Sequence, residues 1–427
     1  MSTERREFQS LPPLGLYVHI PWCIKKCPYC DFNSHEQREE LPEDAYVDSL
    51  LQDLADEIPK VWGRTISSVF IGGGTPSLFS AESLDKLLSG IRALTALAPS
   101  TEITLEANPG TFEQQRFKDY RTLGINRLSI GVQSFSQSSL EQLGRAHSAR
   151  EAFKAIEIAH EAQFDRINLD IMFALPGQTQ KACLTDIRHA LSMSTSHLSC
   201  YELTLEPNTV FARFPPQLPD DDSRARMQEL VAENIEQAGL ARYEISAYAR
   251  TDGNADHRSQ HNMNYWLFGD YIGIGAGAHG KISSANTGDI VRRWKKRQPK
   301  AYLAAQTAQQ RLAGEEIVST EDTALEFLMN ALRLRTGFPL PLFHQHTGVA
   351  LDRWSSVIDS CIDDGLLQQT GLSLHASERG YRWLNNILER FLDSTESDTN
   401  SPPPSNKYPT MPIRLQNSPD QAGEGNE

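Results

Sequence analysis

Cysteine, long apolar runs and surplus positive charge are all scarce in this sequence. Six cysteines in 427 residues are too few for a disulfide-stapled secreted scaffold. No stretch approaches the roughly 18 apolar residues of a membrane span, and Met1 to Ser10 is charged, without the apolar core of a signal peptide. Lys and Arg number 41 against 55 Asp and Glu, and the resulting net charge of −14 argues against binding nucleic acid through its phosphates. We therefore expect a cytoplasmic protein with no membrane span and no nucleic-acid partner.

Half of the cysteines lie in one short segment. Cys23, Cys27 and Cys30 form a CxxxCxxC pattern directly after an apolar, strand-like segment, Leu14 to Pro21. Three thiolates on one loop can each bind one iron of a [4Fe-4S] cluster, which leaves the fourth iron open to an exogenous ligand such as S-adenosylmethionine. A structural zinc site would need a fourth Cys or His at ligand spacing, and no nearby histidine completes a familiar pattern. The spacing therefore predicts a cluster-binding loop.

Strand-like and helix-like segments alternate from Leu14 to about Tyr248. The sequence predicts six strands: Leu16–Ile20, Ser68–Ile71, Glu102–Glu106, Arg127–Val132, Arg166–Phe173 and His197–Leu205. Between them, apolar residues recur at helical spacing in four amphipathic stretches: Asp44–Ile58, Ala81–Leu97, Arg150–Ala162 and Lys181–Met193. Six consecutive βα units predict an α/β fold with a parallel sheet and right-handed crossovers.

Residues with chemical potential follow these predicted strands. The cysteine loop follows the first strand, Gly72–Pro76 the second, Glu106–Pro109 the third and Gln133 the fourth, while Asp170 lies within the fifth. In a parallel sheet the carboxyl ends of the strands share one edge, so these features are expected to meet. Glycines let main-chain amides approach a ligand, carboxylates accept hydrogen bonds from ribose hydroxyls, and Gln133 and Arg145 can orient a carboxylate or an adenine edge.

With these motifs, the chain resembles the radical S-adenosylmethionine proteins of the oxygen-independent coproporphyrinogen oxidase group. The match covers most of the first 250 residues. The resemblance implies a partial (β/α)6, TIM-like barrel with one [4Fe-4S] cluster on the three cysteines. It also implies that nine residues line the S-adenosylmethionine region, with the tyrosine of the cysteine loop near the adenine: Tyr17, Tyr29, Gly73, Gly74, Thr75, Glu106, Gln133, Arg145 and Asp170.

Two features bear on the branch within this group. Decarboxylating members carry a further cysteine two positions after the third, where this chain has Phe32, and a longer extension before the first strand. A second motif, HNxxYW at His261 to Trp266, resembles the signature of the haem-chaperone branch, the HemW-type proteins. An imidazole can ligate haem iron, and aromatic faces can pack on a porphyrin. The resemblance therefore implies haem binding, with four candidate contacts: His261, Asn262, Tyr265 and Trp266.

The rest of the chain contains a basic run, a small C-terminal domain and a polar tail. The basic run Arg292–Arg297 could meet the haem propionates or an acidic partner, or it could be a solvated helix face. From about Val318, two helices, a short hairpin and a last helix predict a winged-helix-like domain, and the polar composition near the end predicts a disordered tail. The expected division is an N-terminal segment 1–13, the barrel 14–250, a mixed connecting region 251–317, an α+β winged-helix-like domain 318–392 and a tail 393–427.

Three functions stay open at this point. The favoured one is a haem chaperone that binds haem and passes it to acceptor haemoproteins, with exchangeable S-adenosylmethionine at the cluster. The second is an oxygen-independent coproporphyrinogen III oxidase of porphyrin biosynthesis, in which the reduced cluster cleaves S-adenosylmethionine to a 5′-deoxyadenosyl radical. The third is a radical methyltransferase that shares the first 250 residues. A homodimer and peripheral contact with membrane haemoproteins also stay open.

Overall fold

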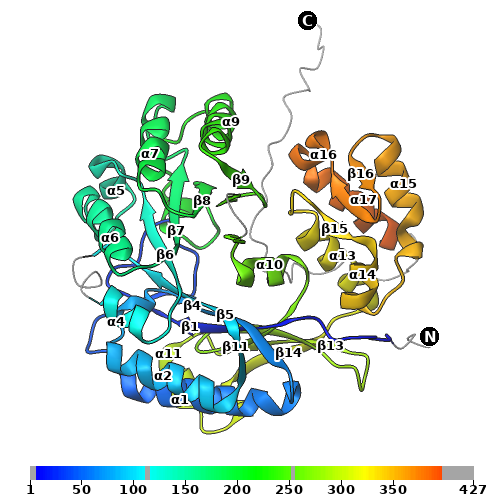
Figure 1. Ribbon diagram of the computed structural model, residues 1–427, viewed down its shortest axis with the longest axis horizontal. Coiled ribbons are helices and arrows are strands. Elements are labelled where there is room, and N and C mark those ends of the chain that lie inside the picture. Colours follow the sequence, from blue (N-terminus) through cyan, green and yellow to red (C-terminus); the bar gives the residue numbers. More distant parts are fainter. Residues whose placement is uncertain (1–5, 111–115, 252–254, 397–427) are drawn as a thin grey trace, which may run out of the picture.

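One twelve-stranded sheet organises most of the molecule. The structure is a computed structural model that describes residues 6–110, 116–251 and 255–396. The strand order is β14-β13-β12-β11-β1-β4-β5-β6-β7-β8-β10-β9, and its central six strands run parallel in chain order, as predicted. These are β1 (Leu14–Ile20), β4 (Thr65–Gly73), β5 (Ala96–Ala107), β6 (Arg127–Gln133), β7 (Arg166–Phe173) and β8 (His197–Glu202). They curve into the half-barrel seen in Figure 1.

The two faces of the half-barrel differ in polarity because side chains alternate along each strand. In β1, Leu16, Val18 and Ile20 are fully buried in the main hydrophobic core, whereas Tyr17 and His19 point to the other face. Helices cover the apolar face (Figure 1): α1 (Glu43–Glu57), α2 (Ala81–Leu94), α4 (Phe117–Thr122), α5 (Gln137–Gln142), α6 (Ala149–Glu161), α7 (Gln180–Ser192) and α9 (Asp221–Gln237), with the short η1 (Ile58–Val61) and η2 (Pro76–Leu78). The inner face therefore carries the polar residues.

The region between the half-barrel and the C-terminal domain belongs to the same sheet. After α8 (Val210–Arg213), β9 (Leu240–Arg242) and β10 (Ala247–Arg250) extend one side of the sheet in antiparallel fashion. Beyond α10 (Gln260–Trp266), β11 (Asp270–Ile274) pairs parallel with β1, and three antiparallel strands follow: β12 (His279–Ser283), β13 (Ile290–Lys295) and β14 (Leu312–Ile317). The segment expected to connect two domains thus adds a second wing to the sheet.

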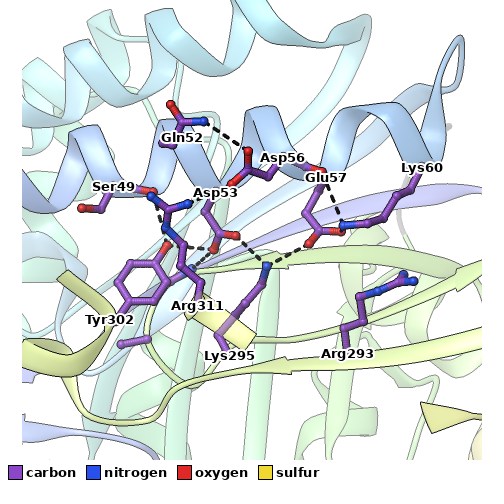
Figure 2. A network of polar contacts seen from close by, with 12 residues as sticks. Ser49, Gln52, Asp53, Asp56, Glu57, Lys60, Arg293, Lys295, Tyr302 and Arg311 are labelled. Carbon is purple, nitrogen blue, oxygen red and sulfur yellow. Dashed lines mark hydrogen bonds and ion pairs between the residues drawn. The ribbon is translucent and has the colours of Figure 1, made fainter. Parts of the chain in front are cut away.

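Buried ion pairs fasten this wing to helix α1. Lys295 of β13 lies 2.5 Å from Asp53 and 2.8 Å from Glu57, and Tyr302 of α11 (Pro299–Leu303) donates to Asp53 at 2.8 Å (Figure 2). Arg311 of α12 (Ala308–Arg311) forms an ion pair with Asp56 of α1. Although burial disfavours the charge, the two carboxylates raise the pKa of Lys295 above its ordinary value. These contacts therefore hold the wing against α1.

This network gives the first testable prediction. Replacing Lys295 by methionine would leave Asp53 and Glu57 buried without their cation, so the free energy of unfolding should fall by about 3–5 kcal/mol. Lys300, which is exposed on α11, supplies the matched control. Denaturant titration of Lys295→Met and Lys300→Met measures the difference, and equal stability of the two variants would contradict this role of the network.

A second hydrophobic core defines the C-terminal domain. It comprises α13 (Thr320–Ala331), α14 (Leu340–Thr347), η3 (Leu351–Trp354), α15 (Ser355–Asp363), α16 (Glu378–Arg382) and α17 (Leu384–Glu396) around a three-stranded sheet of β15 (Phe338–Pro339), β17 (Ser373–Ala376) and β16 (Leu367–Thr370). A small sheet with helices is what the sequence predicts here. No helix in the described ranges is long and apolar enough to span a membrane. Most of the predicted tail, residues 397–427, lies outside the described residues.

Candidate functional site

The three cysteines share one loop at the carboxyl end of β1. The loop begins at β2 (Trp22–Cys23) and returns at β3 (His35–Glu36), which pairs with it. All three thiols are free and partly exposed. The loop packs tightly on the glycine run after β4, because a Cβ on Gly74 would stand 2.5 Å from the Trp22 carbonyl oxygen. Glycine is therefore required there to seat the loop.

The electrostatics of the loop suit an iron cluster. Burial raises the pKa of the Cys23 thiol to about 11, and Cys30 and Cys27 add to this shift because thiolates in one place repel each other. Burial also raises the pKa of Cys30. Bound iron supplies the positive charge that holds such thiols as thiolates. Within the described residues, no three His, Cys, Asp or Glu side chains converge as they would around a single metal ion. Three free thiols on one short loop are the donor set that a [4Fe-4S] cluster takes, so the chemistry of the donors fits such a cluster.

The glycine run after β4 is more internally bonded than the sequence suggests. The amide of Gly73 donates to Glu106 at 2.9 Å, that of Gly74 to the Ile20 carbonyl at 2.8 Å, and that of Thr75 to the Trp22 carbonyl at 2.7 Å. These three amides are therefore not free to hold the carboxylate of a methionine moiety in this structure. The glycines instead permit close packing. Gly73 has φ +117°, and a Cβ there would lie only 2.6 Å from the His19 ring.

Arg145 links the cysteine loop to the strand ends. Its guanidinium lies 3.7 Å from the Cys27 sulfur, and it donates to Asn108 at 2.6 Å and to the Gly131 carbonyl at 2.7 Å. Burial opposes its charge, but Tyr29 and Cys27 raise the pKa of Arg145 further above its ordinary value. A fixed cation thus stands beside Cys27 of the predicted cluster loop, where it would balance an anionic cluster.

Two predicted residues lie on either side of this arginine. Gln133 ends β6 with φ +67°. Its side-chain nitrogen and the guanidinium of Arg145 both pack close to Gly131, where a Cβ would lie 3.3 Å from each. Tyr29 contacts Arg145 and packs against Phe211 of α8, with ring centroids 6.3 Å apart. The tyrosine therefore lies on the side of α8, and its stacking near an adenine stays a prediction.

Glu106 and Asp170 face each other across the inner surface. Burial raises the pKa of Glu106 to about 8, the hydrogen bond from Gly73 opposes this rise, and the nearby Asp170 adds to it. Burial likewise raises the pKa of Asp170, although it accepts hydrogen bonds from Asn168 at 2.9 Å and Ser129 at 3.2 Å. Two desolvated carboxyls that interact with each other are suited to a cationic, hydroxyl-bearing ligand.

His19, two residues after Tyr17, was not predicted from the sequence as a residue of this site. His19 Nε2 lies 2.9 Å from the carbonyl oxygen of Asn33, which can only accept, so this nitrogen carries the proton. His19 Nδ1 must then accept from the Tyr17 hydroxyl, 2.8 Å away. Burial lowers the pKa of His19 to about 4, which keeps this neutral tautomer at pH 7. The period-two alternation of a strand, which puts both residues on the inner face, could have revealed the pair.

The HNxxYW segment forms α10, which lies between the half-barrel and the C-terminal domain (Figure 1). Ser259 caps its start by accepting from the Asn262 amide. Glu102 of β5 accepts from the Gln260 amide at 2.9 Å and pairs with Arg166 of β7 at 2.9 Å. The first turn of the helix is thereby fixed to the inner face of the sheet.

His261 points from α10 toward the predicted S-adenosylmethionine region. Its Nδ1 lies 3.0 Å from the hydroxyl of Ser68 on β4, and its ring packs on Phe70 and Tyr17 with centroids 5.2 and 6.4 Å apart. Burial lowers the pKa of His261 to about 4, so the imidazole is neutral at pH 7. The described residues offer Nε2 no hydrogen-bond partner, which leaves this nitrogen for a ligand. A Cβ at Gly15 would lie 3.4 Å from the His261 ring, which is an ordinary van der Waals contact.

The other predicted haem contacts are distributed along α10. Tyr265 lies one turn from His261, is 38% exposed and packs against Trp266 and Tyr271. Surrounding protein nevertheless raises the pKa of Tyr265 by desolvation, as expected for a side chain on a recessed surface. Asn262 has its amide bound by the helix cap, and its side chain is partly exposed.

The basic run forms strand β13 instead of a helix face. Lys295 is buried in the network of Figure 2, Arg292 pairs with Glu326 at 2.5 Å and Arg293 pairs with Glu315. Most of these charges are thus engaged within the protein, and the idea of a solvated helix face is wrong because the segment pairs with β12 and β14.

Comparison with known proteins identifies the family. The chain is 45% identical over 382 residues to a protein of Escherichia coli (strain K12) named heme chaperone HemW, covering 90% of this chain and 99% of that protein. The chain belongs to the HemW family. The Haemophilus influenzae HemW is also 45% identical, over 386 residues and 98% of its length, and the Bacillus subtilis HemW is 34% identical over 384 residues, again 98% of its length. These alignments cover 90% and 88% of this chain.

Two family models match parts of the chain, and a solved structure shares its fold. The radical SAM superfamily model matches residues 17–190, and the HemN C-terminal domain model matches residues 318–383. The coproporphyrinogen III oxidase HemN of Escherichia coli has the same fold, with a TM-score of 0.75 over 92% of this chain and 95% of that chain at 22% identity. Membership of the radical SAM superfamily implies a [4Fe-4S] cluster and S-adenosylmethionine.

Proposed function

We propose that this protein is a haem chaperone that binds haem on α10 and passes it to acceptor haemoproteins. The observation that carries the proposal is the alignment with HemW over nearly the full length of that relative. The geometry of His261 supports it, because a neutral imidazole with one nitrogen held by Ser68 and the other free is the form that ligates haem iron. Tyr265 and Trp266 supply aromatic faces on the same helix.

The cysteine loop would hold one [4Fe-4S] cluster, with S-adenosylmethionine beside it. When bound, such a cluster can supply an electron to the sulfonium. The part of this chain would be to bind and orient the ligand. Arg145 stands next to the predicted cluster ligand Cys27, and Glu106 and Asp170 would accept hydrogen bonds from the ribose and the cationic groups. Tyr17 lies between the two predicted ligand regions, because it neighbours Glu106 as well as the His261 ring. The haem and S-adenosylmethionine regions would therefore adjoin.

The raised pKa of Glu106 predicts a pH dependence of S-adenosylmethionine binding. Below about pH 8 the carboxyl of the free protein is protonated, and the cationic ligand prefers the ionised form. Affinity should therefore rise with pH by up to about tenfold per unit until pH 8, and then level off. Calorimetry of Glu106→Gln should show weaker binding without this rise, whereas Glu82→Gln, an exposed control on α2, should behave like the wild type. A flat profile for the wild type would remove Glu106 from the site.

One experiment separates the proposal from its main alternative. The haem-loaded protein is mixed with a haem-free acceptor apoprotein, and transfer is followed by absorbance. In parallel, the cluster-loaded protein is incubated anaerobically with coproporphyrinogen III, S-adenosylmethionine and a reductant. We expect haem transfer and no protoporphyrinogen, since Phe32, 53% exposed beside the cluster loop, stands where decarboxylating relatives carry a cysteine. Turnover of coproporphyrinogen without haem transfer would overturn the proposal.

A further inference from the structure

An arginine of the C-terminal domain has a buried hydrogen-bond donor that no described residue accepts. Arg333, just beyond α13, is 8% exposed, and its Nε is buried without a partner among the described residues. Its guanidinium lies 4.4 Å over the ring of Trp266 and forms an ion pair with Glu244, 3.9 Å away, which is too long for a hydrogen bond. A buried arginine normally has its fork of donors satisfied, so an absent acceptor is indicated.

The donors around Arg333 point to the kind of ligand that is missing. The indole Nε1 of Trp266 is also buried without a partner in the described part of the chain. Arg292, from β13, bonds to Glu326 through one nitrogen only, and its Nε is likewise unpaired there. Burial raises the pKa of the Tyr265 hydroxyl, and the charges of Arg292 and Arg333 oppose this rise. Both arginines therefore lie near the same end of α10. Donors of this kind, with planar forks, suit carboxylate groups.

The position of these donors relates them to the haem ligand. Tyr265 follows His261 by four residues, about one turn of α10, and Trp266 is the next residue, rotated by about 100° further around the helix axis. Haem carries its iron at the centre and two propionate carboxylates on one edge. We infer that Arg333, with the Trp266 indole and Arg292, binds the propionate edge of haem at the C-terminal end of α10. This inference rests on the proposed haem-binding function and names the residues that would recognise the carboxylates.

The C-terminal domain would then be part of the haem site. Its His346 lies 2.6 Å from the carbonyl of Leu267, directly after α10, and Phe268 enters the core of that domain. The end of α10 is thus held by the same domain that supplies Arg333, so the arginine is fixed relative to Trp266. Haem would contact the sheet through His261 and the C-terminal domain through its propionates.

Haem and haem dimethyl ester, in which both propionates are esterified, test the inference on the full-length protein. The wild type should bind the ester about tenfold more weakly, the effect of losing one charge-assisted hydrogen bond. Arg333→Gln should weaken haem binding to the level of the ester and leave ester binding unchanged. Arg335→Gln is the matched control, because Arg335 also stacks on an aromatic ring, that of Tyr381, but does not contact α10. A variant that folds poorly would lose both ligands, so the haem-to-ester ratio reports on the propionates alone.

The outcomes distinguish a failure of the propionate inference from a failure of the haem-binding proposal. If the wild type binds haem through His261 but binds the ester equally well, the propionate inference is overturned and the haem-binding proposal stands. If Arg333→Gln keeps the full preference for haem, the inference is likewise overturned. If the wild type binds neither compound, the proposed function fails and this inference fails with it.

Discussion

Replacing Cys23, Cys27 and Cys30 together by serine should reduce reconstituted iron and sulfide from about four each per chain to almost none. The three thiols are the protein donors that the loop brings together, and burial raises the pKa of Cys23 and of Cys30. Visible absorption of the anaerobically rebuilt protein, with iron and sulfide analysis, measures the loss.

Cys361 provides the control for this experiment. It is fully buried in the C-terminal core, away from the cysteine loop, so Cys361→Ser should retain the cluster even if the domain is less stable. Full cluster content in the triple variant would mean that other residues bind the iron. That outcome would contradict the assignment of the loop.

Replacing His261 by alanine should weaken haem binding by at least about tenfold, because the axial nitrogen is lost. Titration by Soret absorbance measures the affinity. The exposed His160 on α6 supplies the control, since His160→Ala removes an imidazole from the surface without touching α10. Unchanged affinity and an unchanged Soret band in His261→Ala would clear this residue of the role.

The same site predicts how haem binding depends on pH. Burial lowers the pKa of His261 from 6.5 to about 4, so the ring stays neutral as the pH falls through 6 and is protonated only near pH 4. Because a proton and iron compete for Nε2, coordination should persist to about pH 4–5, whereas an ordinary imidazole would begin to lose it near pH 6.5. Loss of the Soret shift already at pH 6.5 would contradict the buried position of the ring.

The parallel part of the sheet could be predicted because its signals are local. Runs such as Arg166–Phe173 are buried strands bounded by amphipathic helices, and β7 has the predicted bounds. The helix predicted to reach Leu97 ends instead at Leu94, because Ala96 and Leu97 pair with β4 as the start of β5. Pairing partners overrode the helical pattern at this point.

The second wing could not be predicted because its partners are distant in sequence. β11 becomes a strand of the sheet by pairing with β1, about 250 residues earlier, and Lys295 is buried only because Asp53 and Glu57 meet it. The composition of the basic run therefore suggested an exposed surface that the fold does not have.

Motif residues were found in the sequence, but the groups that orient them were not. His261 stands out in its motif, whereas Ser68, which holds its Nδ1, is an unremarkable serine within a strand. Arg333 has no motif at all, and its significance appears only when its unused donors are seen beside Trp266. Supporting residues of this kind depend on tertiary contacts, which a single sequence does not display.

The most direct test of the haem-binding account is an experimental structure of the full-length protein loaded with haem. The account predicts continuous density between the haem iron and Nε2 of His261, with the macrocycle beside α10. Haem bound at any other position, with His261 still hydrogen-bonded to Ser68 and free of iron, would contradict it.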